Sequence, residues 1–426
     1  MKKYLFLLIA MISALTMSAQ IRGNNIVVSV SPDQSDWTYK TGDKCTFSVS
    51  VLKSNVPLKG AKVDYVMGPV MYENIRKKDV TLTNGTLTLS GTMQTSGFYR
   101  LKVTAHVDGK DYDGLATAAF SPEKIKPVAE CPKDFDAFWQ KTINDARQNV
   151  PLEATKVLMP EKCTDKVNVY QVSFQNDKWG SRTFGILCVP KAPGKYPAMY
   201  KVPGAGIRPY YGDPWEAAKG CIVLEIGIHG IPVTNTQDYY DLLFNGALRN
   251  YWQDNKNNRD EFYYKRVFVG ALRGIDFIAS LPEWDGKNLG VLGSSQGGML
   301  TMVCAAHDSR VSCYAPVHAA LCDHTASLKG QPCGWPHYFF GQKNPDPKEV
   351  ECVGYYDGIN FAKRIKVPGW FSFGYNDEVV PPTSAWATYN SVSAPKEIHP
   401  YPQTGHFWYQ EQYDEWIGWI NKQLGL

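Results

Sequence analysis

The sequence has little net charge and no block of basic residues. Its 45 lysines and arginines stand against 41 aspartates and glutamates, which gives a formal net charge of +4 over 426 residues. A nucleic-acid-binding protein is expected to concentrate lysine and arginine in a patch or along a stripe. The charge pattern therefore gives no reason to expect nucleic acid as a partner.

Long apolar runs are also absent after the N-terminus. No later stretch reaches the roughly 20 apolar residues that a membrane-spanning helix needs. The N-terminus itself joins Lys2 and Lys3 to the apolar run 4–15 and a small-residue exit at Ser18-Ala19, a pattern typical of a secretory signal peptide. We therefore predict a signal peptide at 1–19, an exported protein that is periplasmic or secreted, and no membrane-spanning segment, with a signal anchor as the alternative.

Paired metal-ligand motifs are missing as well. The ten cysteines include no Cys-x-x-Cys pair, and no His-Glu-x-x-His segment occurs. Four residues could still gather around a metal ion: His318, Asp323, His324 and His337. Because their spacing matches no known ligand pattern, we predict neither a metal site nor a cofactor. Disulfides are permitted in an exported chain, although free buried thiols are an equally good expectation.

The length predicts two domains, because about 400 residues exceed what one hydrophobic core usually holds. From about 21 to 120, short alternating apolar runs are separated by turn signals. Asn84-Gly85 and Asp108-Gly109 each predict a tight turn that joins two paired strands. Seven or so short strands favour an immunoglobulin-like β-sandwich over residues 20–122. Such a domain could be a spacer or could bind a glycan or a protein partner.

A second pattern begins after Pro122, Pro127 and Pro132, which mark a linker at 123–131. Over 132–426, short apolar runs alternate with segments of helical periodicity. This alternation predicts a mainly parallel sheet with helices on both faces. The expected strands are 198–202, 221–226, 289–292, 312–316, 369–373 and 397–401, and the expected helices include 265–280 and the C-terminal segment 413–424.

The pentapeptide Gly293-Ser294-Ser295-Gln296-Gly297 follows one expected strand and precedes an expected helix. A serine framed by glycines in this order is typical of the sharp turn that exposes the nucleophile of an α/β-hydrolase. The motif alone is a weak signal, since glycine-rich and serine-rich turns are common. The partners of the serine must decide whether Ser295 is a nucleophile.

An acid and a base follow Ser295 in the order that α/β-hydrolases use. Asp377 comes directly after the expected strand 369–373, and His406 comes after the next strand. Both side chains should therefore project from the same sheet edge as Ser295. Glu378 and Asp323 compete with Asp377 for the role of acid, and His399 competes with His406 for the role of base.

The developing oxyanion needs two backbone amides. Gln296, the residue after the nucleophile, can supply the first. For the second, the segment 203–206 follows an early strand, and Pro203 has no amide hydrogen to donate. Gly204 is the candidate, with Ala205 as the alternative.

Several motifs resemble those of the acetyl xylan esterase and cephalosporin C deacetylase family of α/β-hydrolases, from Pro132 to the C-terminus. The segments that carry the resemblance are 132–139, 293–298, 355–362, 377–382, 389–390 and 405–406. It implies Ser295 as nucleophile, His406 as base, Asp377 as orienting acid, and removal of acetyl groups from xylan, xylo-oligosaccharides or similar molecules. Two segments depart from the family pattern: Gly204 stands where a tyrosine is usual, and Gly227-Ile228-His229 stands where Arg-Gly-Gln is usual.

We therefore expect a serine esterase that acts on an acetylated oligo- or polysaccharide through an acetyl-serine intermediate, with a homo-oligomer as a possible assembly. Aromatic side chains near the active edge could stack on sugar rings, and Tyr210, Trp335 and Trp408 are the candidates. Two alternatives stay open. One is another α/β-hydrolase, such as a serine peptidase or an esterase for a different acyl group, and the other is a non-catalytic glycan-binding protein.

Overall fold

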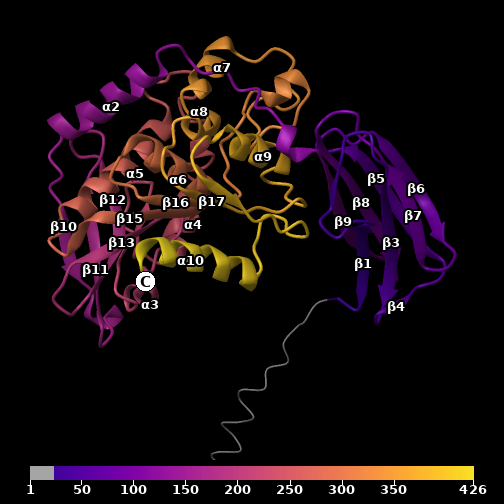
Figure 1. Ribbon diagram of the computed structural model, residues 1–426, viewed down its shortest axis with the longest axis horizontal. Helices are drawn as coiled ribbons and strands as arrows, with labels where there is room; N and C mark the ends of the chain where they lie inside the picture. The colour runs from indigo at the N-terminus through magenta and orange to yellow at the C-terminus, as the bar shows by residue number, and fades with distance from the viewer. Residues whose placement is uncertain (1–23) are drawn as a thin grey trace, which may run out of the picture.

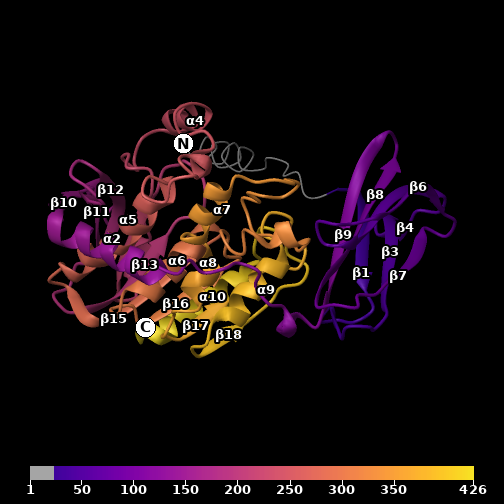
Figure 2. The ribbon, with the colours of Figure 1, turned by 90° about the horizontal axis from the view of Figure 1, so that it is seen from above.

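The structure is a computed structural model that describes residues 24–426, so the predicted signal peptide lies outside the described residues. Figure 1 shows an all-β domain beside a larger domain of mixed helices and strands. In both views, β8 and β9 lie on the side of the all-β domain that faces the larger one (Figures 1 and 2). The two domains are in direct contact at the loop after β17, where Arg100 of the N-terminal domain donates to the Asp377 carbonyl at 3.0 Å.

The N-terminal domain consists of two sheets. One has the path β1-β3-β4, with β7 paired to the other side of β3, and the second has the order β2-β9-β8-β5-β6. Apolar side chains alternate along β3 and β8 and are almost fully buried in one shared core, which is the pattern expected where two sheets face each other. The strands are β1 Ile26–Pro32, β2 Thr38–Tyr39, β3 Cys45–Lys53, β4 Val56–Pro57, β5 Ala61–Pro69, β6 Ile75–Leu82, β7 Thr86–Gly91, β8 Gly97–Val107 and β9 Lys110–Phe120.

Of the two predicted tight hairpins, one is confirmed and one is wrong. β8 and β9 pair as far as Val107 and Lys110, so that Asp108-Gly109 forms a two-residue turn, and both turn residues have positive φ. The strands on either side of Asn84-Gly85 exist, but β6 pairs with β5 whereas β7 pairs with β3. The turn at Gly85, where φ is +76°, therefore carries the chain from one sheet to the other.

The larger domain contains a nine-stranded sheet in the order β10-β11-β12-β14-β13-β15-β16-β17-β18. The pairings from β10 to β14 are antiparallel, and all those from β14 to β18 are parallel. The first three strands of this sheet are additional to those expected from the sequence. The strands are β10 Thr155–Leu158, β11 Val167–Gln175, β12 Arg182–Pro190, β13 Tyr196–Val202, β14 Ile222–Gly227, β15 Trp284–Ser294, β16 Cys313–Val317, β17 Gly369–Phe371 and β18 Lys396–Ile398.

Helices cover both faces of this sheet. Alternate residues of β13 point to opposite sides: Tyr200 packs in the core that contains α5 and α6, whereas Met199 packs in the core that contains α3 and α10. The prediction of a sheet covered on both faces is confirmed. The helices are α2 Phe135–Asn149, α3 Pro214–Ala217, α4 Gln237–Asn245, α5 Tyr263–Ala279, α6 Gln296–His307, α7 Pro347–Gly354, α8 Gly358–Ala362, α9 Pro382–Ser391 and α10 Gln410–Leu424, with short 3-10 turns at Pro122–Lys124, Pro160–Lys162, Tyr251–Gln253 and Ala326–Lys329.

The cysteines and the helix lengths bear on two further expectations. All ten cysteines are free thiols in the described chain, and most of them are buried. Of the two expectations for the cysteines, free thiols are therefore the one that the structure shows. Among residues 24–426, no helix combines the length and the apolar composition needed to cross a membrane.

Candidate active site

Ser295 lies at the sharp turn between β15 and α6. Its backbone has φ 59° and ψ −123°, a conformation that costs a non-glycine residue about 1–3 kcal/mol. Two hydrogen bonds hold the turn in place: the Ser295 amide donates to the Val317 carbonyl at 3.0 Å, and the Ser295 carbonyl accepts from the Ala320 amide at 3.0 Å. The loop after β16 thus stabilises a strained residue, which leaves the Ser295 hydroxyl projecting from the end of the strand.

The glycines on either side of the serine are required by close backbone contacts. A Cβ on Gly293 would lie 2.5 Å from the carbonyl oxygen of Gly297, and a Cβ on Gly297 would lie 2.3 Å from that of Val202. Both distances are shorter than carbon and oxygen tolerate without bonding. The start of α6 therefore packs directly on the end of β13, and this close contact leaves no room for a side chain at Gly297.

His406 connects Ser295 to Asp377. The His406 Nε2 atom lies 3.0 Å from the Ser295 Oγ, and the His406 Nδ1 atom lies 2.8 Å from the Asp377 Oδ2. Because an ionised carboxylate can only accept, Nδ1 carries the proton and Nε2 is free to accept from the serine hydroxyl. The three residues come from the ends of β15, β17 and β18, so the sheet edge brings together all three side chains that the sequence analysis selected.

The Asp377 carboxylate is completely buried. Its Oδ1 atom accepts hydrogen bonds from the amides of Val379 and Val380, both at 2.8 Å, which leaves Oδ2 facing His406. The alternative acids are placed differently. Glu378 is half exposed and pairs with Lys102, and Asp323 accepts from the amides of Val128 and Ala129.

His399, the alternative base, is also engaged elsewhere. It lies near Glu397 and Glu415 and stacks on Trp370. Neither it nor the two alternative acids is hydrogen-bonded to Ser295 or His406.

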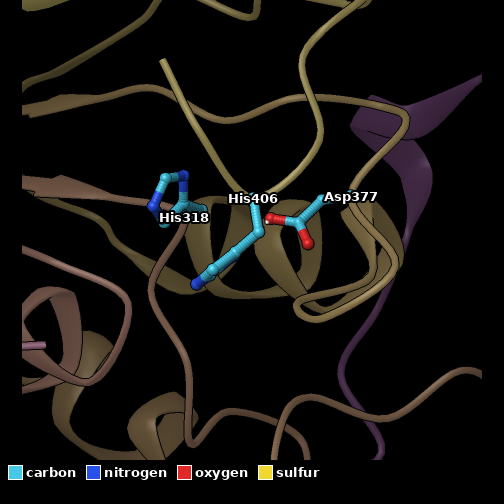
Figure 3. Close-up of side chains that lie close together, drawn as sticks. All are labelled: His318, Asp377 and His406. Carbon is cyan, nitrogen blue, oxygen red and sulfur yellow. Dashed lines mark hydrogen bonds and ion pairs between the residues drawn. The ribbon is translucent and has the colours of Figure 1, made fainter. Parts of the chain in front are cut away.

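A second histidine, His318, packs against His406. Their ring centres are 4.3 Å apart, and Figure 3 shows His318 and Asp377 on opposite sides of His406. The His318 Nε2 atom lies 2.7 Å from the Ser294 Oγ. Burial, together with the nearby His406, lowers the pKa of His318 to about 3, so this ring is neutral at ordinary pH. From the sequence, His318 was expected only as a candidate metal ligand.

His318, Asp377 and His406 also form a group whose ligand atoms lie within 4.8 Å of one another. Such a group could in principle hold a metal ion. However, both ring nitrogens of His406 already bond to Ser295 and Asp377. The other residues considered as ligands do not join this group: His324 packs on Tyr338, and His337 contacts Cys333.

The two predicted oxyanion donors both lie next to Ser295. Gln296 is the first residue of α6, where a backbone amide has no acceptor within the helix. Its buried side-chain oxygen accepts from the hydroxyls of Tyr251 and Tyr264 at 2.8 and 2.9 Å, which holds the side chain in place. A Cβ on Gly204 would lie 3.8 Å from the Cβ of Ser295, so the Gly204 backbone runs close to the nucleophile.

Two side chains hold the loop that contains Gly204. Arg208 Nη2 donates to the carbonyls of Gly204 and Ala205 at 3.0 and 3.1 Å. His229 Nε2 lies 3.0 Å from the Gly206 carbonyl, and its Nδ1 lies 2.8 Å from the Tyr263 hydroxyl. Since a carbonyl only accepts, Nε2 must donate and Nδ1 must accept. Burial lowers the pKa of His229 to about 4, which keeps this tautomer neutral.

A cleft of about 560 Å³ opens over Ser295 and His406, within the usual size range of small-molecule sites. Tyr210 and Trp408 line it, whereas Trp335 does not. Tyr210 is almost buried at 7% exposure, and Trp408 is 41% exposed. Trp335 instead packs against Trp252, with ring centres 5.4 Å apart. Of the three predicted sugar-stacking residues, only Trp408 both lines the cleft and is exposed, and its ring also stacks on His318 with ring centres 5.8 Å apart.

The strand order, the helices on both faces and the strand–turn–helix segment at Ser295 define an α/β-hydrolase. The acetyl xylan esterase (AXE1) family profile matches residues 121–423, beginning directly after β9. The acetyl esterase Axe7A of Xylanibacter ruminicola is 36% identical over 438 aligned residues, which cover 100% of this chain and 97% of the relative. The chain belongs to the acetyl xylan esterase family, and it is a carboxylic ester hydrolase.

Two solved structures agree with this assignment. The acetyl xylan esterase from Paenibacillus sp. R4 is 26% identical with a TM-score of 0.61, and it covers 71% of this chain and 98% of its own. Acetyl xylan esterase 1 from Thermoanaerobacterium sp. JW/SL YS485 is 25% identical with a TM-score of 0.59, and it covers 71% of this chain and 97% of its own. Axe7A thus matches the whole chain, whereas these two structures leave nearly a third of it unmatched.

Proposed function

We propose that this protein removes O-acetyl groups from xylan, xylo-oligosaccharides or related carbohydrates through an acetyl-serine intermediate. The observation that carries the proposal is the hydrogen-bonded chain from Asp377 through His406 to Ser295, at the end of the sheet in a chain of the acetyl xylan esterase family. Such a chain of acid, base and hydroxyl activates a serine as a nucleophile.

In the first step, Ser295 Oγ attacks the acetyl carbonyl carbon while His406 Nε2 takes the hydroxyl proton. The C–O bond to the sugar then breaks, and His406 returns the proton to the departing sugar oxygen. In the second step, His406 takes a proton from water, which attacks the acetyl-serine. Acetate leaves and Ser295 regains its hydrogen.

Charge develops on the carbonyl oxygen in both steps, and the amides of Gln296 and Gly204 are the proposed donors to it. One such donor is worth about 2.7–4 kcal/mol in the transition state. Arg208 and His229 keep the Gly204 loop in place through its carbonyls. Asp377 holds the histidine tautomer and stabilises the imidazolium. No metal or cofactor takes part in this mechanism.

The names of the relatives support an acetylated carbohydrate as the substrate. Trp408 lines the cleft and is 41% exposed, and we assign it the role of a sugar-stacking residue. Tyr210 is too enclosed to offer a ring face and contributes to the wall of the cleft instead.

For the remainder of the chain, we propose a signal peptide at 1–19, an immunoglobulin-like sandwich at 20–122, a linker at 123–131 and the esterase domain at 132–426. The N-terminal pattern of Lys2, Lys3 and the run 4–15 supports export to the periplasm or beyond. The two facing sheets support the sandwich. We also propose a homo-oligomer, for which the family resemblance is the only support.

The test is acetate release from acetylated xylan, acetylated xylo-oligosaccharides, acetylated pectin and an aryl acetate, together with the corresponding butyryl ester and a peptide substrate. We expect release of acetate and little turnover of the butyryl or peptide substrates. Ser295→Ala should abolish acetate release and fluorophosphonate labelling. Ser294→Ala should still be labelled, because it retains Ser295. An intact protein that neither labels nor hydrolyses the aryl acetate contradicts the proposal.

A further inference from the structure

The loop that carries Asp377 has no regular secondary structure and is held from two sides. On the side of the histidine loop, the Tyr375 amide donates to the Pro402 carbonyl at 3.3 Å, and the Asn376 amide donates to the Thr404 carbonyl at 3.2 Å. These bonds use the amides of the loop. The carbonyls of Tyr375 and Asp377 point the other way, toward the N-terminal domain.

Arg100, on β8 of the N-terminal domain, binds those carbonyls. Its Nη2 atom donates to the Tyr375 carbonyl at 3.2 Å and to the Asp377 carbonyl at 3.0 Å. Its Nε atom donates to Thr117 Oγ1 on β9 at 3.0 Å. Because the guanidinium is planar and rigid, the bond to Thr117 sets the direction in which Nη2 points. The N-terminal domain is therefore hydrogen-bonded to the backbone on both sides of Asn376.

Arg100 is a buried charge, and its guanidinium needs these hydrogen bonds to offset the loss of water. The residue is only 4% exposed, and burial lowers the pKa of its guanidinium, although Glu378, Glu73 and Asp377 oppose this effect. A buried charge is costly unless its hydrogen-bonding groups find partners. The nearest carboxylate oxygen, on the half-exposed Glu378, is 4.0 Å away. The loop carbonyls are thus the close acceptors for a charge that the fold has taken out of water.

Two further contacts join the same strands to the same loop. Phe98 packs edge-on against Tyr375, with ring centres 5.1 Å apart. Asn376 Nδ2 donates to the Leu115 carbonyl on β9 at 3.1 Å. None of the residues that line the cleft within the described chain belongs to the N-terminal domain. The N-terminal domain therefore contacts the catalytic residues through the loop that carries Asp377 and not through the wall of the cleft.

We propose that Arg100 is a positioning residue for ester hydrolysis: by binding the carbonyls of Tyr375 and Asp377, it holds the loop so that the Asp377 carboxylate faces His406. The inference rests on the proposed role of Asp377 as the orienting acid. It gives the N-terminal domain a defined part in catalysis, as a support for the acid loop of the other domain.

The test compares variants of the full-length protein by kcat per active site, with sites counted by the end-point of fluorophosphonate labelling. Arg100→Met keeps much of the side-chain volume but removes the donors. We expect kcat per site to fall at least ten-fold on an aryl acetate, with KM changed less than two-fold, because Arg100 does not reach the cleft. Counting sites separates this effect from misfolding, which lowers the number of sites and not the turnover of each.

A milder variant and a control complete the series. Thr117→Val removes only the bond that orients the guanidinium, so we expect a smaller loss of kcat in the same direction even if Arg100→Met does not fold. Lys102→Met is the matched control, since Lys102 lies two residues along the same strand and reaches only Glu378, at 3.4 Å. It should change kcat less than two-fold.

A double variant tests whether Arg100 acts through Asp377. In an Asp377→Asn background, where the orienting acid is already lost, Arg100→Met should add less than a two-fold loss, because residues that act as a unit are not additive. Full additivity, or an unchanged kcat in Arg100→Met and Thr117→Val, would overturn the inference. If instead Asp377→Asn alone retains full activity, the proposed triad fails, which distinguishes the two failures.

Discussion

Replacing Asp377 by asparagine tests the proposed triad most sharply, because the structure determines how the new side chain must sit. In the wild type, one carboxylate oxygen accepts from the amides of Val379 and Val380, and the other accepts from His406. An asparagine has one oxygen and one NH2 group to place in these two positions. Turning the NH2 group toward the two amides would leave both donors unpaired, at about 1–3 kcal/mol for the buried amide of Val380 and less for the partly buried amide of Val379.

The asparagine oxygen therefore stays on the two amides, and the NH2 group faces His406 Nδ1. That nitrogen must then accept, which moves the proton to Nε2 and removes the base from Ser295. In a comparable triad this tautomer change lowers kcat about 10⁴-fold, which corresponds to about 5.5 kcal/mol in the activation barrier. We expect a loss of this size for Asp377→Asn, with little change in KM.

The assay is aryl acetate hydrolysis per labelled active site, accompanied by thermal unfolding to show that the variant is folded. Glu378→Gln is the matched control, since Glu378 is the adjacent acid and is half exposed. It should keep kcat within about two-fold of the wild type, as expected for an exposed charge away from the reacting atoms. A folded Asp377→Asn variant that loses less than ten-fold, or a Glu378→Gln variant that loses as much, would refute the reasoning.

Three further predictions concern the metal, the cleft and stability. Dialysis against EDTA should leave kcat unchanged, and a loss restored by zinc would place a metal at His318, Asp377 and His406. Trp408→Ala should raise KM for an acetylated xylo-oligosaccharide about five- to ten-fold more than for an aryl acetate, because about 1–1.5 kcal/mol of stacking is lost; equal changes for both substrates would argue against stacking. Burial lowers the pKa of His324 to about 3, so between pH 6.5 and 5 the unfolded state binds a proton that the folded state does not. The folded state therefore becomes less stable as the pH falls through this range. Urea titrations at pH 7.5 and pH 5 give the loss of unfolding free energy between these two values. This loss should be about 2 kcal/mol smaller in His324→Leu than in the wild type, and an equal loss in both proteins would contradict the burial effect.

Much of the fold follows from local patterns in the sequence. The apolar runs of β13 to β16 are too continuous for a one-sided sheet, which predicts strands buried on both faces. The expected strand 397–401 is shorter in the structure, where β18 ends at Ile398, because its later residues turn into the loop that leads to His406. The strands β10 to β12 were not predicted: β10 is exposed along its whole length and polar residues interrupt β11, whereas β12 contains the continuous buried apolar run 186–189, a local signal of a strand.

The turn at Asn84-Gly85, which was expected to close a hairpin, shows where local reasoning fails. Alternating residues on either side of the turn do identify two strands. Nothing in the alternation says whether the strands pair with each other or with β5 and β3, in different sheets. The pairing depends on contacts far along the chain, which a local pattern does not contain.

The sequence by itself determined the turn at Ser295, because the glycines around it are demanded by backbone contacts that any chain forming this turn must make. It also determined the order of serine, acid and histidine, because each follows a strand whose end lies at one sheet edge. Only the tertiary structure placed His318 on the His406 ring and Arg100 on the Asp377 loop. Arg100 and Asp377 are separated by 277 residues, and such a contact depends on how two folded domains pack, which leaves no periodic trace in either segment.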